Sequence, residues 1–248
     1  MVDEATRCLT GVYAHPDDET FSGGGTYARY AAAGVRCTIY CATAGDAGKT
    51  SGIAVESREE LGTLRRAELE AARKILGIAE IDLPGHPDGR LIDENADEIV
   101  GEIVRHFRRE KPQVVITFGP EGAPNTHPDH RVISRCTTAA FLLAGNESAF
   151  AEQLESGLEP HAPLRLYYVT WPAPASDAVL KTRGLPASAR IDVRAFRDIE
   201  VQAWAAHKTQ QFLQQRFHET ALTDEELFAY AMGVPQPSPM VDDLFAGL

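Results

Sequence analysis

The sequence predicts an α/β fold, a three-layer Rossmann-like sandwich in which helices cover both faces of a mainly parallel sheet. Apolar runs rich in β-branched residues alternate with longer segments of helical period through the first 145 residues. This order produces parallel strands joined by crossover helices. The length of 248 residues is typical of an α/β domain that stands alone. We therefore expect a single domain over residues 1–248, with a core from about 7 to 215 and a Pro-rich, extended or loosely ordered tail over about 233–248.

The first half of the chain accounts for most of the expected sheet. Four apolar runs are expected to be strands, at residues 8–14, 35–43, 79–85 and 113–119. Three helices should accompany them, at about 19–33, 57–76 and 93–110. The second helix is the clearest, because its apolar residues recur at helical period and Gly77 follows as a C-terminal signal. Later in the chain we expect strands at 164–171 and 189–193 and a helix over 199–213.

Composition and charge restrict the partners and the location of the protein. The chain has 24 Lys+Arg against 36 Asp+Glu, and its net charge of -12 would repel a phosphate backbone or an anionic membrane surface. Nucleic acid is therefore not an expected partner. No window approaches the roughly 18 apolar residues of a membrane span and no signal peptide is recognisable, so we expect a cytoplasmic protein. The four cysteines, at 8, 37, 41 and 136, are expected to be reduced and buried.

Two loops are rich in side chains that bind metals. "AHPDDE" follows the first expected strand, and "GPEGAPNTHPDHR" follows the fourth. Ligands of such sheets bind beyond the carboxyl ends of the strands, so both loops should reach the same edge. Four of their side chains suit a divalent metal, zinc above all, with iron or manganese as alternatives: His15, Asp18, His127 and His130. A catalytic zinc takes three protein ligands and leaves a position for water, so the surplus groups would supply acid and base chemistry.

These motifs also have purely structural explanations. Acidic residues complement the dipole at a helix N-terminus, and proline after histidine forms turns. The recurrence of His-Pro-Asp followed by a ligand-type residue, at 15–18 and 127–130, favours the metal site. A third copy at 86–89 ends in Gly89 and is expected to be a turn, which leaves Asp88 free to face the crevice. The "GGGTYA" pattern at 23–28 does not join a strand directly to a helix, so we interpret it as close packing of the helix against the sheet rather than dinucleotide binding.

The order of these motifs resembles that of the LmbE-like, or PIG-L, family of zinc-dependent deacetylases. This family includes the de-N-acetylases of N-acetylglucosaminyl-phosphatidylinositol and the deacetylases of the mycothiol and bacillithiol pathways. The resemblance runs from about residue 7 to about 215, and its most specific part is the pair of His-Pro-Asp motifs. The segments that carry it are "AHPDDE", "RRAELEAARKILG", "GHPDG", "THPDHR" and "AAHKTQ".

The resemblance implies a role for each residue of the two loops. It implies that zinc is ligated by His15, Asp18 and His130, and that Asp17 is the general base that activates the metal-bound water. By the same analogy, His127 stabilises or protonates the tetrahedral intermediate and Asp129 orients it. Amide hydrolysis needs these functions: a hydroxide, a donor for the oxyanion and a proton for the departing amine. Glu19 is expected to hold a metal ligand in orientation.

Substrate binding is expected to involve three further residues. Arg65 and Asp88 resemble family positions that contact substrate hydroxyls, with a mutual surface salt bridge as the alternative. Some sugar deacetylases of the family have tyrosine two positions before the first histidine of the second motif. Asn125 occupies this position here and is expected to supply an amide donor instead.

These implications define one expected function and two alternatives. We expect an enzyme, a metal-dependent hydrolase that removes the acetyl group from an N-acetylglucosamine-type sugar conjugate. A deacylase of another amide in a natural-product pathway is the nearest alternative, and a non-catalytic sugar- or nucleotide-binding module is the alternative from another class. Asp17 distinguishes them, because a binding module has no use for a further carboxylate beside the metal. A homo-oligomer is left open by the sequence.

Overall fold

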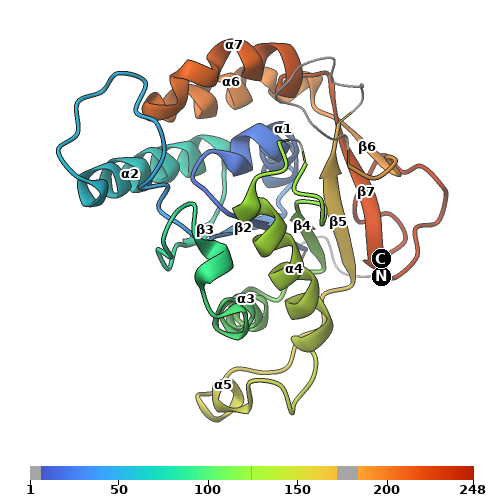
Figure 1. The fold of residues 1–248 in the computed structure, drawn as a ribbon. Coiled ribbons are helices and arrows are strands. Elements are labelled where there is room, and N and C mark those ends of the chain that lie inside the picture. The colour runs from blue at the N-terminus through green and yellow to red at the C-terminus, as the bar shows by residue number, and fades with distance from the viewer. Residues whose placement is uncertain (1–6, 124, 172–183) are drawn as a thin grey trace.

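A mainly parallel sheet forms the centre of the protein (Figure 1). The computed structural model describes residues 7–123, 125–171 and 184–248. Within them the sheet has the order β3-β2-β1-β4-β5-β7-β6. The strands from β3 to β5 are parallel, whereas β7 runs antiparallel to both β5 and β6. The strands are β1 (Cys8–Tyr13), β2 (Arg36–Cys41), β3 (Glu80–Asp82), β4 (Val114–Thr117), β5 (Arg165–Thr170), β6 (Ala189–Asp192) and β7 (Glu225–Gly233).

Helices cover both faces of the sheet, which confirms the expected α/β sandwich. Figure 1 shows α1, α2 and α6 on one face, with α3 and α4 on the other. The start of α2 follows from its sequence, because the Ser57 hydroxyl accepts the Glu60 N–H at the N-terminus. Gly77 ends it with a φ of 74°, as expected. The helices are α1 (Asp18–Ala32), α2 (Arg58–Leu76), α3 (Ala96–Glu110), α4 (Pro128–Leu143), α5 (Ala151–Glu155), α6 (Arg197–Ala206) and α7 (Gln214–Arg216).

The C-terminal part of the chain differs from expectation. The single helix expected over 199–213 is wrong, because α6 ends at Ala206 and a 3-10 helix follows from Lys208 to Leu213. His207 between them is fully buried and leaves the helical conformation, with φ −80° and ψ 67°. The strand β7 was not foreseen, since "EELFAYAMG" is rich in helix-forming residues. Pairing with a strand on each side overrides that preference.

The Pro-rich tail is anchored to the sheet, so the expectation of loose order is wrong. Leu244 and Phe245 are buried in the main core. The fully buried Arg165 of β5 donates to the carbonyls of Leu244 and Ala246, at 2.9 and 3.1 Å. These contacts extend the packed structure beyond residue 215, because the apolar side chains fill the core and the guanidinium satisfies backbone carbonyls next to them.

The three consecutive glycines allow close packing of α1, although against α6 and the end of β6 rather than against the sheet. A Cβ on Gly24 would lie 2.9 Å from Glu200 Cγ, and one on Gly25 would lie 2.6 Å from Val193 Cβ. The helix is kinked at Gly23, and the Glu226 carboxylate of β7 accepts the N–H groups of Gly25 and Thr26 freed there, both at 2.9 Å.

Two further expectations concern the chain as a whole. All four cysteines are free and buried, as the sequence predicts. Across residues 7–123, 125–171 and 184–248, no helix is long and apolar enough to cross a membrane.

Candidate active site

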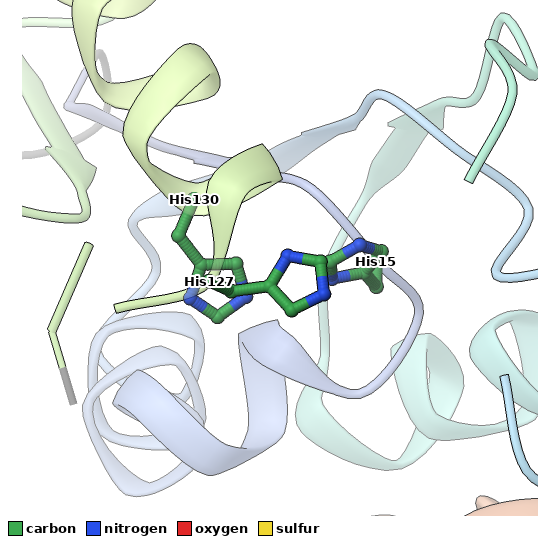
Figure 2. Close-up of side chains that lie close together, drawn as sticks. All are labelled: His15, His127 and His130. Atoms are coloured by element: carbon green, nitrogen blue, oxygen red, sulfur yellow. The ribbon is translucent and has the colours of Figure 1, made fainter. Parts of the chain in front are cut away.

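The two His-Pro-Asp loops meet at the carboxyl edge of the sheet. One joins β1 to α1 and the other joins β4 to α4, and β1 and β4 are parallel neighbours where the strand order reverses. Open α/β sheets bind ligands at this switch point. Figure 2 shows His15, His127 and His130 converging there. Their ring centroids are 4.8 to 5.3 Å apart, and one nitrogen from each ring lies within 4.8 Å of the others.

Asp18 completes the set of ligand-type side chains. Its carboxylate oxygens lie 3.4 Å from His15 Nδ1 and 3.3 Å from His130 Nε2. It also accepts the backbone N–H of His15 at 2.8 Å, which fixes the loop around it. Phe118, just beyond β4, stacks on His130 with 3.9 Å between ring centroids. The expected ligands His15, Asp18 and His130 are therefore close together, and His127 is near enough to be an alternative ligand.

The electrostatics of the cluster favour a positive charge. Asp88 and Asp129 contact His15 Nε2 at 3.1 and 3.2 Å. Burial disfavours protonation of His15, but hydrogen bonds to Asp129, Asp18 and Asp88 outweigh it and hold its pKa well above the usual range. Burial likewise opposes ionisation of Asp18, yet His130 and His15 hold its pKa well below normal. Buried carboxylates and imidazoles in this arrangement fit a divalent cation, which would supply the charge that they require.

Asp17 lies beside this cluster in a strained conformation. Its φ of 116° and ψ of −27° are rare for a residue with a side chain. Its carboxylate is 3.5 Å from Arg65 Nη2, and its backbone N–H donates to Glu19 Oε2 at 2.9 Å. Burial raises the pKa of Asp17 to about 7, with Arg65 acting against this rise and Asp18 adding to it. A carboxylate that titrates near neutral pH is suited to general base catalysis.

His127 caps the N-terminus of α4. Its Nδ1 accepts the Asp129 N–H at 3.2 Å, and Asn125 Oδ1 accepts the His127 N–H at 3.0 Å. Burial, followed by the neighbouring His15 and His130, lowers the pKa of His127. The Asp129 carboxylate was expected to orient His127. It contacts His15 instead and accepts the backbone N–H groups of Gly89 and Leu91, so Asp129 touches His127 through its own backbone N–H.

Arg65 and Asp88 both reach the site. Arg65 donates to the carbonyls of Pro16 and Gly45 and pairs with Asp17. The Asp88 carboxylate accepts the Ala47 N–H at 2.9 Å in addition to contacting His15. Among the described residues no ion pair joins Arg65 with Asp88, and both are buried, so the alternative of a mutual surface bridge is wrong. Arg66, the next residue on α2, is exposed and donates to the Leu83 carbonyl.

The site opens into a cavity of about 190 Å³. Asp129 lies behind it, fully buried against His15. The other eight predicted site residues line it, so the structure places all nine together while their chemical roles stay predictions. The cavity is lined by His15, Asp17, Asp18, Arg65, Asp88, Asn125, His127 and His130, joined by Phe21, Ser22, Gly48, Phe118, Gln210 and Leu213.

Sequence reasoning assigned no role to His207. This fully buried side chain places Nε2 2.8 Å from Glu19 Oε1. The "AAHKTQ" segment was its only signal. Three other histidines lie outside the site: His106 and His161 contact Asp82 and the Pro112 carbonyl, and His218 is exposed. His86 pairs with Glu102 at 2.9 Å, while Asp88 and Gly89 after it form the expected turn.

Comparison with known proteins identifies a family and similar sequences. The PIG-L family model, described as GlcNAc-PI de-N-acetylase, matches residues 11–141. A 1D-myo-inositol 2-acetamido-2-deoxy-alpha-D-glucopyranoside deacetylase of Rhodococcus erythropolis is 31% identical, with 100% of this chain and 99% of the relative covered. A mycothiol S-conjugate amidase of Streptomyces coelicolor is 33% identical, with 64% of this chain and 59% of the relative covered.

Solved structures share the fold. The N,N'-diacetylchitobiose deacetylase of Pyrococcus horikoshii has a TM-score of 0.75 at 19% identity, and the match covers 91% of this chain and 84% of that one. The 4-carboxy-2-hydroxymuconate hydratase of Pseudomonas putida KT2440 has a TM-score of 0.76 at 16% identity, over 94% and 99% of the two chains. One fold thus supports both a deacetylase and a hydratase, so these two likenesses show the fold alone.

Proposed function

This chain belongs to the PIG-L family of GlcNAc-PI de-N-acetylases, and on that premise we propose that it is a metal-dependent deacetylase of an N-acetylglucosamine-type sugar conjugate. The substrate class follows from the sequence relatives, which include a deacetylase of an acetamido-glucopyranoside of inositol aligned over the whole chain. The hydratase of the same fold is only 16% identical to this chain, so its reaction is not a basis for assigning one here.

The observation that carries the proposal is the position of Asp17. A site that only binds metal needs ligands and nothing more. Here a further buried carboxylate lines the same cavity as the ligand set, in a strained conformation supported by Arg65 and Glu19. Strain of this kind is maintained at sites that need a group in one place. A base beside a metal site is what amide hydrolysis requires.

The proposed metal is zinc, held by His15, Asp18 and His130. Bound there, a divalent metal would polarise the acetyl carbonyl and lower the pKa of a water molecule. Asp17 accepts the proton of the attacking water and passes it to the amine nitrogen as the C–N bond breaks, so that acetate and a free amine are released.

His127 stabilises the developing oxyanion in this proposal. Its Nδ1 accepts a backbone N–H, so the neutral ring carries its proton on Nε2. The lowered pKa of His127 keeps the ring neutral at physiological pH. The Nε2–H is then a donor for the carbonyl oxygen as it gains charge. Asp129 holds this tautomer through its backbone N–H and fixes His15 through its carboxylate.

The test is Asp17→Asn, assayed with a panel of N-acetylglucosamine conjugates by detecting free amine. Asparagine keeps the size of the side chain but removes its basicity. Bound metal should therefore persist while kcat falls roughly a hundredfold or more. Asp93→Asn, a matched change at an exposed position, should leave kcat unchanged. Loss of metal together with activity would make Asp17 a ligand, and a wild-type protein that releases no amine from any conjugate would contradict the function.

A further inference from the structure

His207 lies behind the active site, where the chain leaves α6. Its Nε2 lies 2.8 Å from Glu19 Oε1 and 3.5 Å from the Thr20 hydroxyl, and the ring is fully buried. A buried pair of this kind stabilises a fold little, because the cost of removing both groups from water offsets their attraction. Stability is therefore a weak reason for its presence.

Glu19 connects His207 to Asp17. One oxygen of the Glu19 carboxylate accepts from the imidazole, and the other accepts the Asp17 backbone N–H at 2.9 Å. The strained angle is φ of Asp17, 116°, which is the rotation about the N–Cα bond. The nitrogen of that bond carries the N–H that Glu19 accepts. The contact thus acts on the atom that would move if the backbone relaxed.

The strain needs such support. A residue in this region of φ and ψ is strained and persists only where its surroundings hold it. Arg65, which lies on α2, donates a hydrogen bond to the Pro16 carbonyl and forms an ion pair with the Asp17 carboxylate. The Asp17 carbonyl accepts the N–H groups of Thr20 and Phe21 in the first turn of α1. Glu19 holds the remaining polar group of the residue, its backbone N–H.

His207 is itself fixed to the same helix as Arg65. Thr209 donates its backbone N–H and its hydroxyl to Glu68 of α2, at 2.9 and 2.6 Å. Glu68 is buried and lies about one helical turn after Arg65. The segment from His207 to Thr209 and the helix α2 therefore hold the Asp17 loop as one unit.

We propose that His207 is a positioning residue for Asp17: through Glu19 it holds the strained Asp17 backbone that keeps the carboxylate at the cavity. The inference rests on the proposed function, in which Asp17 transfers the proton. His207 does not line the cavity, so its removal should change the rate of the chemical step and leave substrate binding intact.

The experiment compares His207→Ala, His207→Gln and His106→Ala in the metal-loaded protein. The Ala variant should lose tenfold or more in kcat, with KM within about twofold and metal content unchanged. The glutamine amide nitrogen reaches the position of Nε2 and can donate to Glu19, so His207→Gln should recover most of the rate. His106 is the matched control, because it is also fully buried and pairs with a carboxylate, Asp82, at 2.7 Å. Its removal should lower the melting temperature but not kcat per folded molecule.

Crystal structures of the wild type and His207→Ala supply a measurement that does not depend on activity. The φ of Asp17 should move from about 116° toward the ordinary negative range in the variant. A normal kcat in His207→Ala, an equal loss in the Ala and Gln variants, or an unchanged Asp17 backbone would overturn the proposal. Should His207→Ala fail to fold, Glu19→Ala replaces it, because it removes the acceptor of the Asp17 N–H, and it must lower kcat in the same way. A wild type that is inactive on every conjugate refutes the proposed function and leaves the role of His207 open to the structural test. The φ of Asp17 in the two crystal structures then decides whether His207 holds that backbone.

Discussion

Replacing Glu200 by glutamine should stabilise the protein, and the gain should grow as the pH rises. Glu200 of α6 is buried against Gly24, and neither of its carboxylate oxygens has a hydrogen-bond partner among the described residues. Burial, reinforced by the negative charge of Glu226, raises the pKa of Glu200 to about 10. Glutamine has nearly the same shape and no charge to bury.

The sign and size of the effect follow from proton linkage. The pKa of Glu200 is higher in the folded chain than its ordinary value of 4.5, so the folded state keeps a proton that the unfolded state releases. Wild-type stability therefore falls as the pH rises above about 4.5, by at most about 1.4 kcal/mol per pH unit. Between about pH 5 and pH 8 this amounts to on the order of 2–4 kcal/mol, or roughly 5–15 °C in melting temperature for a chain of this size.

The assay is thermal unfolding of wild type and Glu200→Gln at several pH values. The difference in melting temperature between them should widen steadily from pH 5 to pH 8. Glu225→Gln is the control, since Glu225 is exposed and lies 3.5 Å from Arg190, an arrangement worth less than about 1 kcal/mol. A constant difference between Glu200→Gln and wild type, or a variant less stable at every pH, would show that Glu200 is ionised and satisfied in the folded protein.

Three further outcomes are expected. Elemental analysis should find about one divalent metal per chain, and alanine substitution of His15, Asp18 or His130 should remove it. Full retention of the metal in all three variants would exclude this ligand set. Arg65→Ala and Asp88→Ala should each lower kcat/KM tenfold or more. The first removes the ion pair of Asp17, and the second removes the contact of Asp88 with His15, whereas Arg66→Ala on the exposed face should change little. Gly25→Ala should lower the melting temperature by several degrees, since its Cβ would lie 2.6 Å from Val193 Cβ. An unchanged melting temperature would show that Val193 can move away at no cost in stability.

The parts of the site that sequence predicted are those determined locally. His15 and Asp18 follow β1 directly, and His130 follows β4 through a short loop, so the apolar runs located the motifs and the parallel sheet brought them together. The turn after His86 was also local, and it places Asp88 at the same edge. For these residues the local sequence pattern and the topology of the sheet together determine their position at the site.

The parts that escaped prediction depend on distant partners. His207 is 188 positions from Glu19, and the "AAHKTQ" segment around it carried a family resemblance but no indication of this contact. The strand β7 is composed of helix-forming residues and owes its conformation to pairing on both sides. The strain at Asp17 was not predicted either, because the contacts that support it include Arg65 of α2 and His207 after α6 as well as the neighbouring Glu19.

Arg65 shows how the site could be misjudged from its motifs alone. Its resemblance to a substrate-binding position predicts a guanidinium that faces sugar hydroxyls. In the structure the two terminal nitrogens contact the carbonyls of Pro16 and Gly45 and the Asp17 carboxylate. Nε is buried and has no partner within the part of the chain that the structure describes. Little donor capacity is left for a substrate, so the main effect of Arg65 on catalysis should pass through Asp17. On this reasoning Arg65→Ala lowers kcat more than it raises KM, whereas a change confined to KM would restore the sugar-binding role.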